Sequence, residues 1–157
     1  MGALLRAIPL KALNSGSRYE MELNIKPIPS SSILLVEDDE VTLQCYIIIL
    51  SKKYPDVRFH SAIDGKMGLE LFKTFLPDIV ITDINMPEMC GAQLADKIHA
   101  IKPDTQFIVL TGDSEKKILH DSAGNGYSSV HYLVKPVNFE TFFTSIEQCL
   151  REIGQQT

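Results

Sequence analysis

Short, almost wholly apolar runs alternate along the chain with longer segments of helical periodicity. The first run, ILLV at 33–36, is followed by a helical pattern over residues 41–54 that Pro55 ends. The alternation continues, with strands predicted at 57–62, 79–82, 106–110 and 130–134, and helices at 66–75, 91–101, 114–123 and 139–153. Five strand–helix units in succession predict an α/β fold with a parallel sheet covered by helices on both faces.

Linker-like residues mark the start of this pattern. The stretch PIPSSS at 27–32 is rich in proline and serine, so residues 1–32 are predicted to be an N-terminal extension and linker. The domain is predicted to span residues 33–153, with a tail at 154–157. The net charge of the whole chain is −5 and residues 1–32 are net basic, so the domain itself is strongly acidic. An acidic domain is not expected to bind nucleic acid through its phosphates.

The lengths of the apolar stretches and the spacing of the cysteines indicate in which cellular compartment the protein works. No apolar run approaches the roughly 20 residues that a membrane-spanning helix needs. The three cysteines are far apart and form no CxxC pair, which is typical of reduced thiols. We therefore expect a cytoplasmic protein without a membrane span.

Polar side chains follow four of the five predicted strands at the point where each strand ends. In parallel sheets these ends share one edge, where ligands bind at a switch in strand order. The residues expected to meet there are Glu37, Asp38 and Asp39 after the first strand, Asp83 after the third, Thr111 after the fourth and Lys135 after the fifth.

Carboxylates gathered at one edge repel each other unless a cation lies between them. Magnesium prefers carboxylate and carbonyl oxygens. The pattern therefore predicts a Mg²⁺ site formed by Asp38, Asp83 and a backbone carbonyl just past Asp83, with Glu37 acting through water or from behind these ligands.

A carboxylate can also act as a nucleophile toward phosphorus. Asp83 is the best candidate because it follows a short buried strand and precedes the loop INMP. Lys135 and Thr111 would then address the charged phosphoryl oxygens, one by its ammonium group and the other by its hydroxyl.

Four segments, ILLVEDDE, IVITDINMPEMCG, IVLTGD and YLVKP, resemble the signature segments of response-regulator receiver domains, in the same order. The resemblance covers about residues 32–151 and implies a (βα)₅ doubly wound sheet of flavodoxin-like topology. It implies that Asp83 is the phospho-acceptor and that Asn85 supplies the metal-binding carbonyl. The other implied assignments are the acidic pair Glu37 and Asp38, the hydroxyl of Thr111 and the lysine Lys135, with a cis Lys135–Pro136 peptide.

The resemblance also implies how the protein would work. Thr111 and Tyr132 match the switch pair of the family, and we expect phosphorylation to draw the Thr111 hydroxyl inward and Tyr132 after it. Asn85 and Asp113 could orient water and so shorten the life of the phosphoryl group. The implied donor is a histidine kinase or a histidine phosphotransfer protein, and the downstream partner is an unknown protein.

Three other functions fit parts of the pattern. An aspartyl-phosphate phosphatase would need a second acid at Asn85, which cannot act as one. A flavodoxin-like cofactor module would need a phosphate loop where the chain has EDDE. A receiver-like scaffold that binds partners without phosphorylation stays open. We expect a monomer or weak dimer that is no enzyme beyond its own phosphorylation and dephosphorylation.

Overall fold

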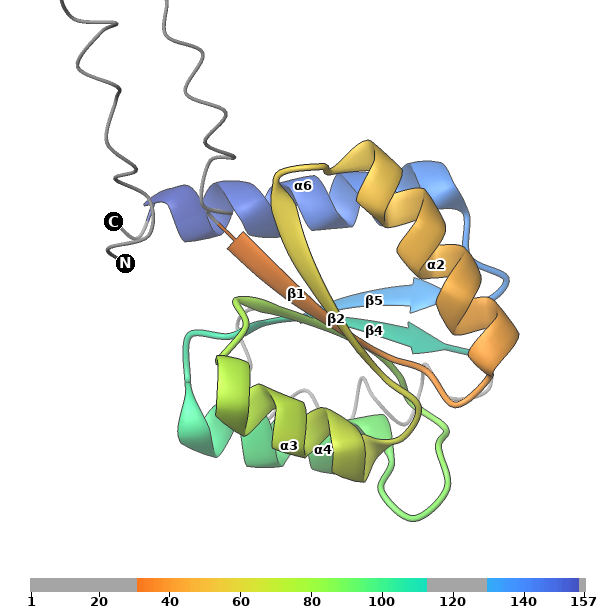
Figure 1. Cartoon of the computed structure of the whole chain (residues 1–157), viewed down its shortest axis with the longest axis vertical. Coiled ribbons are helices and arrows are strands. Elements are labelled where there is room, and N and C mark those ends of the chain that lie inside the picture. Colours follow the sequence, from red (N-terminus) through yellow and green to blue (C-terminus); the bar gives the residue numbers. More distant parts are fainter. Residues whose placement is uncertain (1–30, 113–129, 156–157) are drawn as a thin grey trace, which may run out of the picture.

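The computed structural model describes residues 31–112 and 130–155, which form one sheet with helices on both sides (Figure 1). The strands are β1 (Ser31–Val36), β2 (Val57–Ala62), β3 (Ile79–Asp83), β4 (Gln106–Thr111) and β5 (Val130–Val134). All neighbouring pairs are parallel, in the order β2-β1-β3-β4-β5. This is the flavodoxin-like order, so the predicted doubly wound sheet is confirmed.

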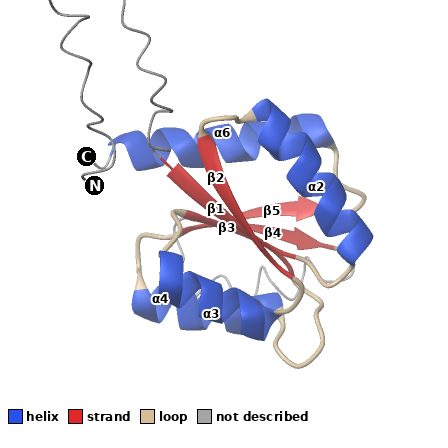
Figure 2. Ribbon diagram, viewed as in Figure 1, coloured by secondary structure: helices blue, strands red, loops and turns tan. Residues whose placement is uncertain are grey.

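Within the described residues, four helices cover the two faces of this sheet, and Figure 2 shows how they lie on it. They are α2 (Glu40–Lys53), α3 (Gly65–Phe75), α4 (Gly91–Ile101) and α6 (Phe139–Gln155). Helices α2 and α6 lie on one face, and α3 and α4 lie on the other. The helix predicted at 114–123 lies outside the described residues. None of the described helices is long and apolar enough to cross a membrane.

Alternation along the buried strands divides the core in two. In β1, Ile33 and Leu35 join the core under α2 and α6, whereas Leu34 and Val36 join the core under α3 and α4. Because successive side chains point to opposite faces, a strand covered on both sides has to be apolar throughout. This explains why the runs in the sequence do not alternate with polar residues.

Side chains that accept backbone N–H groups start three of the helices. Asp39 caps α2 by accepting from the Val41 N–H, and Asp64 caps α3 by accepting from the Met67 N–H at 2.7 Å. Asn138 Oδ1 accepts from the Glu140 and Thr141 N–H groups at the start of α6. These caps satisfy donors that the first helical turn leaves unpaired.

Strand β1 begins two residues earlier than the sequence predicts. Ser31 and Ser32 pair with Val57 and Arg58 of β2, and the Ser32 N–H donates to Asp78 Oδ2 at 3.0 Å. The sequence pattern does not predict the strand at Ser31 and Ser32, because these serines belong to the predicted linker and the apolar run starts only at Ile33. Helix α6 likewise continues past residue 153 to Gln155.

Candidate functional site

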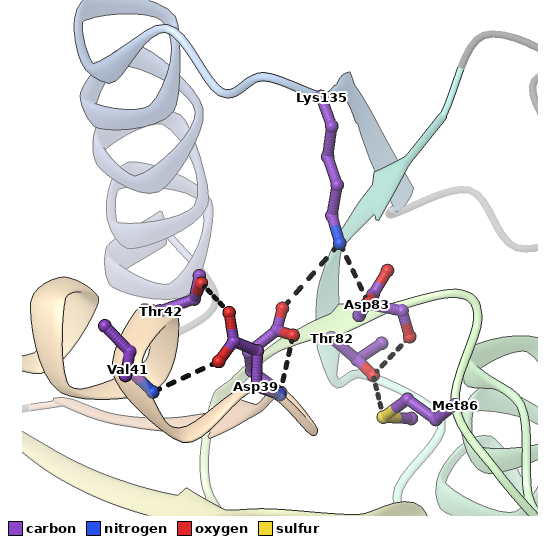
Figure 3. A network of polar contacts seen from close by, with 8 residues as sticks. Asp39, Val41, Thr42, Thr82, Asp83, Met86 and Lys135 are labelled. Carbon is purple, nitrogen blue, oxygen red and sulfur yellow. Dashed lines mark hydrogen bonds and ion pairs between the residues drawn. The ribbon is translucent and has the colours of Figure 1, made fainter.

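Acidic and basic side chains meet where the strands end. Lys135 follows β5, and its Nζ lies 2.8 Å from Asp83 Oδ2 at the end of β3 and 3.8 Å from Glu37 Oε2 after β1 (Figure 3). The Asp83 and Glu37 side chains are only 8% and 4% exposed, whereas the Lys135 side chain is 36% exposed. The lysine thus bridges two buried carboxylates from the solvent side.

The turn between β1 and α2 holds the acidic residues in place. Glu37 Oε1 accepts a hydrogen bond from the Asp39 N–H at 3.1 Å. Asp39 in turn accepts from the Thr42 hydroxyl at 2.6 Å and so belongs to the cap of α2 (Figure 3). Asp38, between them, is exposed. Glu37 and Asp38 therefore point to the site, while Asp39 has a structural role in starting the helix.

The backbone around Asp83 is fixed from several directions. The Thr82 hydroxyl donates to Asp83 O at 2.9 Å, and the Ile84 N–H donates to Leu110 O at 3.0 Å. Gly91, the first residue of α4, donates its N–H to Ile84 O at 2.8 Å. A Cβ added at Gly91 would lie only 2.5 Å from Asp83 O. The start of α4 therefore lies directly against the backbone of Asp83.

Electrostatics at the site follow from this crowding. Burial raises the pKa of Glu37, and the nearby Asp83 raises it further, although the Asp39 N–H and Lys135 oppose the change. Burial would lower the pKa of Lys135, but its hydrogen bond to Asp83 and the charges of Asp83 and Glu37 outweigh burial and raise it. The cluster thus holds more negative charge than one ammonium group neutralises.

Glu37, Asp38 and Asp83 offer carboxylate oxygens that lie within 4.8 Å of one another. Glu37 Oε2 is fully buried and accepts no hydrogen bond from the described residues. An all-oxygen set with excess negative charge suits a hard divalent cation such as Mg²⁺, which keeps several waters. The residues present therefore fit the predicted metal.

Thr111 and Tyr132 lie on adjacent strands. Thr111 ends β4 next to Leu110, the register partner of Asp83, and its buried hydroxyl donates to Gly112 O at 2.9 Å. Tyr132 is half-buried on β5, opposite Val109 and against the core under α3 and α4. Because residues two apart share a face, Val109 and Thr111 point to this same side of the sheet.

Three further sequence predictions have different outcomes. Asn85 is exposed, two residues after Asp83, and the role of its carbonyl stays a prediction. Asp113 lies outside the described residues. The Lys135–Pro136 peptide is cis, as the resemblance implied.

Sequence reasoning missed Gly91 as a site residue. Gly91 is the last residue of the segment IVITDINMPEMCG, which resembles a family signature, but the sequence alone does not show that this glycine approaches Asp83. Its closeness to Asp83 depends on how the loop 84–90 folds back.

Comparisons with known proteins agree with this arrangement. The family described as the response regulator receiver domain matches residues 33–147. The chain is 33% identical over 125 residues to the "Uncharacterized transcriptional regulatory protein YesN" of Bacillus subtilis (strain 168), covering 79% of this chain and 33% of that protein. The chain also covers 10% and 50% of two other curated relatives, so it spans at most half of these three proteins.

Solved structures give the same result. A response regulator receiver domain protein from Clostridium thermocellum has a TM-score of 0.74 at 25% identity, covering 81% of this chain and 99% of that one. The signal receiver domain of an HD domain-containing protein from Pseudomonas fluorescens Pf-5 has a TM-score of 0.70 at 33% identity, covering 78% and 95%.

Proposed function

The chain belongs to the response regulator receiver domain family, and from this premise we propose that Asp83 accepts a phosphoryl group from a histidine kinase or a histidine phosphotransfer protein. The observation that carries the proposal is the 2.8 Å contact between Lys135 Nζ and Asp83 Oδ2 within a cluster of three carboxylates. Asp83 would be the nucleophile, the ammonium group of Lys135 would be a positive charge held beside it, and the carboxylate oxygens would be ligands for a metal.

Phosphoryl transfer to Asp83 forms one bond to phosphorus and breaks another. A carboxylate oxygen of Asp83 forms a bond to phosphorus while the bond from phosphorus to the donor imidazole nitrogen breaks, and that nitrogen keeps the electron pair. Lys135 changes from a partner of Asp83 to a partner of a phosphoryl oxygen, without leaving its place. The backbone contacts of Asp83 keep the nucleophile in position.

Asp38, Asp83 and the Asn85 carbonyl would hold Mg²⁺, with Glu37 close behind them. When bound, the metal neutralises part of the charge on the transferred group. The buried Glu37 Oε2, which lacks a hydrogen-bond donor among the described residues, supports a cation in this place. Asn85 and Asp113 would influence how fast water removes the phosphoryl group.

A change in protein binding would follow phosphorylation. The Thr111 hydroxyl, at the end of the strand next to Asp83, would leave Gly112 O and bond to a phosphoryl oxygen. Tyr132, on the same face of the next strand, would turn into the space that opens. This local event would alter the surface that the downstream protein reads.

The surface beside the site is suited to a protein donor. Val41 and Ile48 are 73% and 60% exposed, and Cys45 between them is also exposed. These residues share one side of α2, which starts at the acidic turn. We propose that the donor protein covers this apolar stripe, because its histidine has to reach the adjacent Asp83.

Incubation with Mg²⁺ and acetyl phosphate tests the function, with intact mass as the measurement. The wild type should gain one phosphoryl group, whereas Asp83→Asn should gain none and chelation of Mg²⁺ should stop the reaction. An unmodified wild type that still folds would favour the scaffold that works without phosphorylation. Turnover of a chromogenic phosphate ester would instead favour a phosphatase.

A further inference from the structure

The turn that joins β2 to α3 contacts two segments of the proposed metal site, although it supplies none of the proposed ligands. This β2–α3 turn spans residues 62–65, from the last residue of β2 to the first residue of α3. The Glu37 N–H donates to Ala62 O at 3.1 Å, so one end of the turn holds the acidic segment that follows β1. At the other end, Gly65 lies against Met89 in loop 84–90. The turn therefore braces both segments from outside the site.

The contact between Gly65 and Met89 leaves no room for a side chain at position 65. A Cβ added to Gly65 would lie 2.9 Å from Met89 Cβ, 2.9 Å from Met89 O and 3.1 Å from Met89 Cγ. Neither Met89 O nor Met89 Cβ is the end of a flexible side chain, so any larger residue has to displace the backbone of the loop. The φ angle of Gly65 is not in the left-handed region, so glycine serves the close approach here and not an unusual backbone conformation.

Loop 84–90 is itself closed and packed. The Gly91 N–H donates to Ile84 O at 2.8 Å and joins the two ends of the loop. Glu88 has a φ angle of 67°, which few residues other than glycine adopt, and Met86 is buried in the core under α3 and α4. Packed segments transmit strain, so a displacement of this loop is passed on to the Asn85 peptide, whose carbonyl is a proposed Mg²⁺ ligand.

We propose that Gly65 is a positioning residue that sets the distance between the acidic segment after β1 and loop 84–90, and thereby the affinity for Mg²⁺. The proposal rests on the proposed function, because Asp38 and the Asn85 carbonyl are ligands only if Mg²⁺ binds between these two segments. Mg²⁺ requires nearly ideal octahedral geometry with ligands at about 2.0–2.1 Å, so even a small displacement of one ligand weakens binding. Gly65 would act through Met89 and would not contact the metal.

Calorimetric titration of the full chain with Mg²⁺ tests the role of Gly65. We expect Gly65→Ala to raise the Kd for Mg²⁺ by about tenfold, as changes around metal ligands commonly do. The matched control is Gly68→Ala in the same helix, where the added Cβ would lie 2.9 Å from Val36 Cγ2, a side-chain methyl group. Both variants force one carbon into a packed place and should lower the urea midpoint, but Gly68→Ala should keep the Kd within about twofold of the wild type.

A second variant loosens the same contact without adding an atom. Met89→Ala removes Met89 Cγ, one of the atoms nearest to Gly65, and should raise the Kd by more than about twofold even if Gly65→Ala does not fold. The rate of phosphorylation by acetyl phosphate is then measured at increasing Mg²⁺. In Gly65→Ala and Met89→Ala more Mg²⁺ should be needed for half the maximal rate, whereas the maximal rate should stay within about twofold of the wild type.

The outcomes separate this proposal from the proposed function. An unchanged Kd in Gly65→Ala and Met89→Ala, or an equal loss of affinity in Gly68→Ala, would overturn the role of Gly65. A maximal rate that stays about tenfold low at saturating Mg²⁺ would also overturn it, because the turn would then act on Asp83 and not on the metal. If the wild type binds Mg²⁺ and gains a phosphoryl group, these results concern Gly65 alone. If the wild type does neither, the proposed function fails and the role of Gly65 fails with it.

Discussion

Replacement of Gly91 by alanine should displace the backbone of Asp83, because the added Cβ would collide with it. The added Cβ would lie 2.5 Å from Asp83 O, 3.0 Å from Ile84 Cα and 3.2 Å from the Asp83 carbonyl carbon. All three are backbone atoms, which cannot move aside as the end of a flexible side chain can. An ordinary contact begins at 3.4 Å, so the start of α4 and the Asp83 peptide have to separate by about 0.9 Å.

Both stability and phosphorylation should respond to this displacement. Forcing an extra carbon into a packed place costs roughly 1–3 kcal/mol, which a urea unfolding curve resolves. A misplacement of about 1 Å near a reacting group can lower its rate by roughly 10²-fold. We therefore expect Gly91→Ala to accept phosphoryl groups from acetyl phosphate much more slowly than the wild type, even at temperatures where it is fully folded.

Gly154 provides the matched control, because it lies in the last turn of α6 and a Cβ there meets nothing within 4 Å. Gly154→Ala should raise stability by about 0.4–1 kcal/mol and leave the phosphorylation rate unchanged. If Gly91→Ala had the urea midpoint and rate of the wild type, the close approach of α4 would not constrain Asp83 and our reasoning would be refuted.

Three further substitutions give distinct results. The pKa of Glu37 is raised above 4.5 in the folded protein, so its contribution to stability is full below that pH and is lost as pH rises through the raised value. In the absence of Mg²⁺, Glu37→Gln should therefore become more stable relative to the wild type as pH rises from 4.5. A difference in urea midpoints that does not change with pH would contradict this expectation. The same variant should bind Mg²⁺ more weakly. Lys135→Met leaves two buried carboxylates without their cation, and allowing for the partial exposure of the lysine we expect a loss of about 1–2 kcal/mol in Mg²⁺-free urea titrations. An unchanged midpoint would show that the ion pair does not stabilise the fold. Asn138→Ala removes the cap of α6 and should cost about 1 kcal/mol while Asp83 is phosphorylated at the normal rate; a slower rate would mean that this helix start influences the site.

The sheet and the edge that carries the site could be predicted from the sequence because both depend on local patterns. Apolar runs such as IVIT mark strands buried on both faces, and the residue that ends each run has to lie at the common edge. Asp83 and Lys135 were therefore expected to be neighbours. Their 2.8 Å contact could not be predicted, since it depends on strand register and on the path of the chain after β5.

Contacts between distant segments account for what the sequence left undetermined. The closeness of Gly91 to Asp83 requires the fold of loop 84–90, and the interlocking of Tyr46 with Phe142 requires α2 and α6 to lie on one face. In the sequence Tyr46 is only one of several apolar residues that are spread around this helix among polar ones. The early start of β1 was missed because serine carries no strand signal by itself.

Chemical mapping of the phosphoryl group tests the central claim most directly. Borohydride reduces an aspartyl phosphate to homoserine, and peptide mass spectrometry then locates the changed residue. After reaction with acetyl phosphate and Mg²⁺, we predict homoserine at position 83 alone, and none when Mg²⁺ is chelated. Homoserine at Asp38 or another carboxylate, with Asp83 intact, would contradict the account.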